Sequence, residues 1–364
     1  RLQHLCDAGG AVAAQAALAQ MALAAGLYAG PVRGTKHVPE VGAWLPEHGV
    51  CCPVLAHVSP EKKPLVLVVF YRSYLVAADL APVEALCAAL RARGFDVFGL
   101  FAPSLKAPGA AAWGARQIAH LAPAAIVNAT SFSGRGAQGT SPLDAGGVPV
   151  FQVALATSTR TAWAEADRGL SPADLAMHVV LPEVDGRLFA GVTSFKEPQE
   201  RDPDLQFARV AHVPDAERIA AAAERVARWI RLAATPASER RLALVLSTYP
   251  GRDWNMAHAV GLDALASAKA ILEDLSEAGY GVETDLSAEA LSAARLRWPL
   301  TAYKAALQRL PKRLQDDLET AWGAAETDPD CVDGTFSFRA LRRGAALVAL
   351  QPERGSPAQR DDDY

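Results

Sequence analysis

The chain has 364 residues, of which 51% are hydrophobic and 21% are charged, and its formal net charge is -4 at pH 7. This composition indicates a globular protein of about two domains and argues against a disordered or membrane-spanning chain. The negative charge disfavours nucleic acid as a partner, because neutralising phosphates requires a basic surface. The five Cys have no disulfide or metal-ligand spacing, which fits a reducing compartment, so we expect a cytoplasmic protein.

The first 62 residues precede any regular α/β pattern. Residues 1–30 are rich in Ala and predict a helix; Gln15 and Gln20 interrupt the apolar stretch and argue against a membrane span or a signal sequence. Residues 31–62 are punctuated by Pro and Gly. We therefore expect 1–62 to form an N-terminal helix and an irregular connection with room for one short strand.

Residues 63–215 read as a first α/β domain, because short apolar runs alternate with helical patterns. The predicted elements are strands at 65–70, 95–101, 124–128, 148–155 and 178–182, and helices at 82–93, 110–121 and 171–177. The polar, Pro-rich segment 196–217 is expected to cross between domains.

Residues 216–364 read as a second α/β domain that carries a helical insertion and is truncated. The predicted elements are strands at 241–247, 280–284 and 345–350, and helices at 215–233, 264–272, 287–310 and 311–322. The second domain repeats the order of the first: buried strand, polar loop, helix closed by Gly, strand. The fold class predicted is α/β, with two Rossmann/flavodoxin-like parallel-sheet lobes and additional helices, and ligands are expected beyond the carboxyl ends of the strands.

One motif nearly matches a phosphate-binding loop. The stretch 134–141 has the glycines, but Thr140 stands where the motif needs a Lys to reach the β- and γ-phosphates. We therefore expect no ATP hydrolysis through this motif. Nearby, His178, Glu183 and Asp185 could form a metal set, but a hydrogen-bonded His and a turn at Asp185-Gly186 are favoured, since Asp-Gly commonly marks turns.

The loop after the first strand of the second domain gathers side chains suited to a ligand. Arg252 can bind a carboxylate in bidentate fashion, and Trp254 offers a flat face to a conjugated ring. Asp253 adds a carboxylate, and His258 could bind a metal or accept a proton. A solvated loop with one buried aromatic is an equal alternative. The corresponding loop of the first domain contains Arg72 and carries fewer side chains of this kind.

Three acids, Asp316, Asp317 and Glu319, fall on the last turns of the predicted helix 311–322. Carboxylates there oppose the helix dipole, so a cation should compensate them. A metal could do so, or Lys312 and Arg313 nearby, and solvated acids are the default interpretation.

Several strings of the chain form a recognisable set. The most specific is Gly169 to Gly186, and supporting ones are Phe70-Tyr71-Arg72, Ile126 to Thr130, Ser194 to Glu197, Val260 to Asp263 and Gln351-Pro352. Taken in chain order, they resemble the large subunit of aerobic cobaltochelatase, of the CobN type, with the magnesium chelatase H subunit as a more distant relative. The resemblance covers most of residues 45–355 and corresponds to the amino-terminal part of a longer family chain.

This resemblance implies a ligase that inserts Co²⁺ into the corrin precursor hydrogenobyrinic acid a,c-diamide, while AAA+ partner subunits of the CobS and CobT type hydrolyse ATP. An acid ahead of a Trp-Gly pair is implicated in metal delivery in the magnesium relatives, and Glu319 matches it here. A second acid of those relatives falls near Pro357 and is not retained.

From the loops and the resemblance together we expect three sets of site residues. They are Glu319 and His258 for catalysis; His258, Asp253 and Glu319 for the metal; and Arg72, Asn128, Lys196, Arg252 and Trp254 for the macrocycle. This piece alone is expected to be inactive. The alternatives are a two-lobed α/β ligand-binding module, a magnesium chelatase H-like subunit, and a scaffold that docks partner subunits through 287–322.

Overall fold

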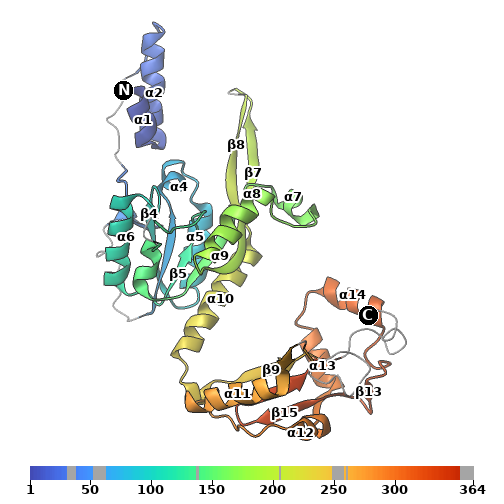
Figure 1. The fold of residues 1–364 in the computed structure, drawn as a ribbon. Helices are drawn as coiled ribbons and strands as arrows, with labels where there is room; N and C mark the ends of the chain where they lie inside the picture. The colour runs from blue at the N-terminus through green and yellow to red at the C-terminus, as the bar shows by residue number, and fades with distance from the viewer. Residues whose placement is uncertain are drawn as a thin grey trace. The chain divides into compact units, whose positions relative to one another are not determined.

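The computed structural model describes residues 1–30, 38–51, 63–136, 139–204, 206–247, 258–259 and 261–352. Contacts divide the chain into two compact units, Arg1–Arg231 and Leu232–Tyr364. Each unit combines sheet and helices (Figure 1), so the predicted α/β class is confirmed. The predicted domain boundaries at 62 and 215 stay a proposal.

The first unit is built on an eight-stranded sheet in the order β2-β1-β4-β3-β5-β6-β7-β8. The strands are β1 Gly42–Leu45, β2 Gly49–Cys51, β3 Leu65–Tyr71, β4 Asp96–Ala102, β5 Ala125–Asn128, β6 Val150–Leu155, β7 Leu188–Asp202 and β8 Phe207–Pro214. Strands β3 to β7 are parallel, whereas β1 and β8 pair antiparallel with β4 and β7. The parallel strands follow the flavodoxin-like order, in which the direction of sheet growth reverses between β3 and β5.

Helices cover both faces of this sheet, α5 Ala81–Arg91 and α10 Ala216–Ala234 on one and α6 Pro108–Leu121 on the other. The other helices of the unit are α1 Leu2–Ala8, α2 Gly10–Ala24, α4 Arg72–Val76, α7 Arg160–Glu165, α8 Pro172–Leu175, the π-helix η2 Ala176–Val180 and α9 Leu181–Val184, with a 3-10 turn η1 at Pro142–Gly146. Along β3, Val66 and Val68 belong to the cluster that includes α5 and α10, whereas Leu67 and Val69 pack with α6. The uninterrupted apolar run of β3 is thus buried on both faces, as predicted.

The strand predicted at 178–182 is wrong, because this stretch is helical and belongs to η2 and α9. Its buried positions are Asp174, His178, Pro182 and Asp185, which follow the three-to-four-residue period of a helix. Three of the four are polar, so the hydrophobic pattern concealed the helical period.

The crossing between domains predicted at 196–217 is also wrong, since most of this segment forms the antiparallel hairpin of β7 and β8 within the first unit. The outer part of β7 is exposed and polar, and Pro198 lies within it, opposite Val210. A strand without a buried face has no alternating apolar pattern, and its Pro and charged residues read as a linker.

The second unit holds two three-stranded sheets and a two-stranded ribbon, in the orders β15-β16-β9, β12-β14-β13 and β10-β11. The strands are β9 Leu242–Leu246, β10 His258–Ala259, β11 Leu262–Asp263, β12 Leu296–Pro299, β13 Cys331–Val332, β14 Thr335–Phe338, β15 Ala340–Arg343 and β16 Ala346–Leu350. The helices are α11 Ala264–Glu277, α12 Ala288–Ala293, α13 Leu300–Leu307 and α14 Lys312–Trp322, with a 3-10 turn η3 at Ala237–Glu239. Strands β9 and β16 pair in parallel, as two apolar runs far apart in sequence.

Two predictions for this unit are wrong. The predicted strand 280–284 is reduced to one bridge between Val282 and Gly344. The predicted helix 287–310 is divided into α12, β12 and α13, because the chain becomes extended at 296–299 and pairs with β14. Within the part of the chain that the structure describes, none of the helices is both long and apolar enough for a membrane crossing.

Candidate functional sites

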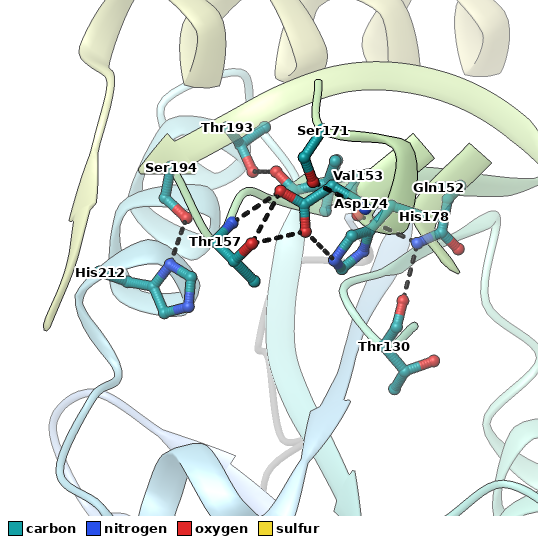
Figure 2. Close-up of polar contacts among 11 residues, drawn as sticks. Thr130, Gln152, Val153, Thr157, Ser171, Asp174, His178, Thr193, Ser194 and His212 are labelled. Atoms are coloured by element: carbon teal, nitrogen blue, oxygen red, sulfur yellow. Dashed lines mark hydrogen bonds and ion pairs between the residues drawn. The ribbon is translucent and has the colours of Figure 1, made fainter. Parts of the chain in front are cut away.

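Buried polar side chains gather beyond the carboxyl ends of β5 and β6 in the first unit (Figure 2). The Asn128 side chain donates to Gln152 Oε1 at 2.7 Å and accepts from the Thr130 hydroxyl at 2.8 Å. Gln152 Nε2 in turn donates to the Thr130 carbonyl at 2.7 Å. Two buried amides therefore fix the first turn of the loop that leaves β5.

Asp174 is the most deeply buried acid of this edge, with 0% of its surface exposed. Its carboxylate accepts from the Thr157 backbone N–H at 2.9 Å and from the Thr157 hydroxyl at 3.0 Å (Figure 2). The Asp174 backbone N–H donates to Ser171 Oγ at 3.1 Å, which caps α8. A buried charge needs such donors, so Asp174 joins the loop after β6 to the helical segment 172–184.

His178 lies one helical turn further along and faces Asp174, with its Nε2 4.0 Å from Asp174 Oδ1. Only 3% of His178 is exposed, and its Nδ1 has no hydrogen-bond partner among the described residues. Burial lowers the pKa of His178, and the Asp174 carboxylate opposes part of that effect. The imidazole is therefore neutral at pH 7.

His212 on β8 is a second buried imidazole at this edge. Its Nδ1 lies 3.2 Å from Ser194 Oγ, and its backbone N–H donates to Asp79 Oδ1 at 2.9 Å. Burial lowers the pKa of His212; Asp79 opposes this, and Lys196 adds to it. Burial also raises the pKa of Tyr74, which packs edge-on against His212, to about 12. Both imidazoles and the phenol are thus held neutral near pH 7.

The second unit contains a groove of about 620 Å³ between α13, α14 and the β12-β14-β13 sheet. Four aromatic side chains form its apolar wall: Trp298, Tyr303, Phe336 and Phe338. The ring centroids of Trp298 and Tyr303 are 5.4 Å apart in an edge-on arrangement, and those of Tyr303 and Phe336 are 5.1 Å apart. Such packing gives the groove a rigid wall.

Charged groups line the same groove. Lys304 of α13 forms an ion pair with Glu326, and Lys312 of α14 pairs with Asp316 at 2.6 Å. Glu319 is exposed on α14 and lines the groove together with Trp322. The groove therefore combines an aromatic wall with an accessible carboxylate.

The predicted site residues of the first unit lie on strands or loops of its carboxyl edge. Asn128 ends β5, Arg72 follows β3, and Lys196 of β7 is paired in register with His212. The Arg72 guanidinium donates to the carbonyls of Val38 at 2.8 Å and Pro39 at 2.9 Å. Arg72 thus holds the segment before β1, and its role toward a macrocycle stays a prediction.

The predicted site residues of the second unit are described only in part. Glu319 is in the groove, and the backbone of His258 belongs to β10. Arg252, Asp253 and Trp254 lie outside the described residues. Among the described residues, no group of three or more His, Cys, Asp or Glu side chains is arranged to hold a metal ion.

Sequence reasoning favoured a hydrogen-bonded His178 and a turn at Asp185-Gly186. The structure shows the turn, but it places His178 4.0 Å from Asp174, and sequence reasoning missed this acid and the contacts of His212. The sequence predicted a helix at 171–177 but ended it before His178; the capping pattern Ser171-Pro-Ala-Asp174 followed by an uninterrupted helix would have placed His178 one turn beyond Asp174. No local signal pointed to His212 or to the groove aromatics, because pairing between distant strands brings them together.

Comparison with known proteins gives a consistent result. The family model described as CobN/Magnesium Chelatase matches residues 6–364. Aerobic cobaltochelatase subunit CobN of Sinorhizobium sp is 35% identical over 322 residues, which are 83% of this chain and 25% of the relative. The subunit of the same name from Pseudomonas aeruginosa is 34% identical over 346 residues, 89% of this chain and 28% of the relative.

Among solved structures, the catalytic subunit of cobaltochelatase from Mycobacterium tuberculosis superposes with a TM-score of 0.73 at 26% identity. The match covers 98% of this chain and 31% of that one. The chain thus spans between 25% and 31% of the length of these three proteins.

Proposed function

Because the chain belongs to the CobN/magnesium chelatase family, as its motifs predicted, we propose that it is the macrocycle-binding part of a cobaltochelatase large subunit. The observation that carries the proposal is the superposition of nearly the whole chain on a cobaltochelatase catalytic subunit. The reaction is insertion of Co²⁺ into hydrogenobyrinic acid a,c-diamide in the cytoplasm, with ATP hydrolysed by AAA+ subunits of the CobS and CobT type. This part alone does not turn over.

The macrocycle binds beyond the carboxyl ends of the first-unit strands, the usual ligand position in such sheets. Lys196 and Arg72 supply positive charge for its carboxylates, and Asn128 acts by fixing the loop after β5. Arg252 and Trp254 complete the predicted substrate set. The position of Lys196, Arg72 and Asn128 at the carboxyl edge of the first-unit sheet supports these assignments.

Insertion requires removal of pyrrole protons and exchange of the water bound to cobalt. An exposed carboxylate serves both needs, because it accepts a proton and offers an oxygen ligand. Glu319 is the carboxylate that we assign to this role, and its exposure in the groove supports the assignment. His258 and Asp253 are proposed as further metal ligands, with His258 also able to accept a proton.

The test is cobalt insertion by the full-length subunit with its AAA+ partners. Glu319→Gln removes the basic oxygen while keeping the shape, so insertion should fall about a hundredfold with little change in macrocycle affinity. Glu273→Gln, an exposed acid of α11, is the control and should retain the wild-type rate. An unchanged rate in Glu319→Gln would remove that residue from the reaction, and a wild-type subunit that binds no macrocycle would overturn the proposed function.

A further inference from the structure

Phe132 has an unusual backbone and an unusual position. It lies in the loop after β5, and its φ is +66°. Among the described non-glycine residues with positive φ, it is the only aromatic one; the others are Ala, Gln and Asp. Bulky residues rarely adopt this region. The residue is nevertheless 49% exposed, so burial of its side chain in the core does not explain the conformation.

The backbone around Phe132 is held by parts of the chain that are distant in sequence. The Phe132 N–H donates to the Met177 carbonyl in the π-helix at 2.7 Å. The Ser131 carbonyl accepts from the Tyr71 hydroxyl, at the end of β3, at 2.6 Å. The loop is thus tied to the end of β3 and to the π-helix η2.

Residues on both sides of this pair are fixed as well. The Thr130 carbonyl accepts from Gln152 Nε2. Beyond Phe132, the Asp185 carboxylate accepts from the Ser133 hydroxyl at 2.8 Å and from the Gly134 N–H at 2.6 Å. Five consecutive residues therefore have their positions set by bonds to β3, β6 and the helical segment 172–185. The conformation of Phe132 is imposed by its surroundings.

Backbone strain that neighbouring structure enforces is concentrated at binding sites, where it presents a group in advance. The bond from Tyr71 to Ser131 places this loop between the carboxyl ends of β3 and β5, where the sheet order reverses. Ligands of flavodoxin-like sheets bind at that reversal. Phe132, with its strained backbone and exposed side chain, thus lies in the loop where ligands of such sheets bind.

The chemistry beside the ring indicates the kind of ligand. Arg135, three residues further on, has a half-exposed side chain whose Nε lies 3.6 Å from the buried Asp185 carboxylate. An exposed aromatic ring and a half-exposed guanidinium in the same loop suit a flat conjugated ring that carries carboxylates.

We propose that Phe132 is a macrocycle-binding residue, whose ring stacks on the conjugated face of the tetrapyrrole while Arg135 contacts a carboxylate at its edge. The inference rests on the proposed function and adds to it the residue that receives the ring. The cluster of five anchored residues serves to hold Phe132 ready for the ligand.

The experiment is an absorbance titration of hydrogenobyrinic acid a,c-diamide into the full-length subunit. Phe132→Ala and Phe132→Gly should raise Kd about tenfold, and Phe132→Tyr should remain close to wild type. Phe132→Gly should also keep an unfolding midpoint at least as high as wild type, because Gly tolerates the positive φ. Phe207→Ala, at an exposed Phe of β8, is the matched control and should bind normally.

The outcomes separate the two proposals. Wild-type affinity in both Phe132→Ala and Phe132→Gly would overturn this inference and leave the proposed function intact. Normal macrocycle affinity combined with loss of capture of the AAA+ subunits would make Phe132 a protein contact, which also overturns it. Absence of macrocycle binding by the wild type would remove the proposed function, and this inference with it.

Discussion

His178 Nε2 lies 4.0 Å from Asp174 Oδ1, and both side chains are buried at the carboxyl edge of the first sheet. The pair occupies successive turns of a helical segment whose middle is a π-helix. π-helical turns are often found at functional sites. Here the segment supplies the Met177 carbonyl and the Asp185 carboxylate that fix the loop carrying Phe132.

Acidification should destabilise the first unit through His178. Its pKa is lowered in the folded state relative to about 6.5 in the unfolded chain. The unfolded chain therefore binds the proton more readily, and stability falls as pH drops below about 6.5 toward the folded pKa. His212 contributes with the same sign.

The prediction is checked by urea unfolding at a series of pH values. His178→Gln should show a flatter dependence of the unfolding free energy on pH between 7 and 5, with His212 maintaining a remaining slope. His120→Gln, an exposed position on α6, should follow the wild-type curve. Parallel curves of unfolding free energy against pH for His178→Gln and wild type would refute the assignment of this pH dependence to His178.

Removal of the Asp174 carboxylate should destabilise the same unit. Asp174→Ala removes the buried carboxylate that accepts from the Thr157 N–H and hydroxyl, at a cost of about 1–3 kcal/mol in unfolding free energy. Asp167→Ala, at an exposed carboxylate of the preceding loop, should change it by less than about 0.5 kcal/mol. Denaturant unfolding measures both, and equal values would contradict the role of Asp174.

Arg72 gives a prediction that separates structure from binding. Arg72→Ala should lower the unfolding free energy by about 1–3 kcal/mol, because the carbonyls of Val38 and Pro39 lose a shared donor. Arg72→Lys keeps the charge but not the planar fork, so it should restore macrocycle affinity more fully than stability. Wild-type affinity in Arg72→Ala would remove Arg72 from the substrate-binding set.

The aromatic wall of the second-unit groove should contribute to stability. Trp298→Ala removes the edge-on contact with Tyr303 and the contact with Phe338, and should cost about 1–3 kcal/mol. Trp298→Phe should recover part of it. Calorimetry measures the loss, and a wild-type unfolding transition in Trp298→Ala would show that the wall carries no packing energy.

The elements predicted correctly are those whose sequence periodicity matches their burial. Strand β3 is apolar throughout and buried on both faces, and α10 has Ile219, Ala222 and Val226 at helical spacing on its buried side. The hairpin of β7 and β8 and the second half of the helical segment 172–184, where a strand was expected at 178–182, were mispredicted for the opposite reason. One is exposed and polar for much of its length, and the other buries Asp174 and His178 in place of apolar residues.

The candidate site residues also differ in whether local sequence patterns could indicate them. Asn128, Arg72 and Lys196 could be proposed from the sequence because each lies on or directly after a predicted strand or in a predicted crossing segment. Phe132 could not, since its significance lies in a backbone angle and in bonds from residues up to 60 positions away, as for Tyr71 and Ser131. Those contacts are set by the strand order, which local patterns do not specify.

The central claim is tested most directly by a thermal-shift comparison on the full-length subunit with hydrogenobyrinic acid a,c-diamide and with a panel of nucleotide sugars, the ligands of two-domain α/β glycosyltransferases, which represent the alternative of a two-lobed ligand-binding module. The proposed function predicts a saturable rise of the unfolding midpoint with one equivalent of the macrocycle and no rise with any nucleotide sugar. Stabilisation by a nucleotide sugar, with no response to the macrocycle, would contradict it.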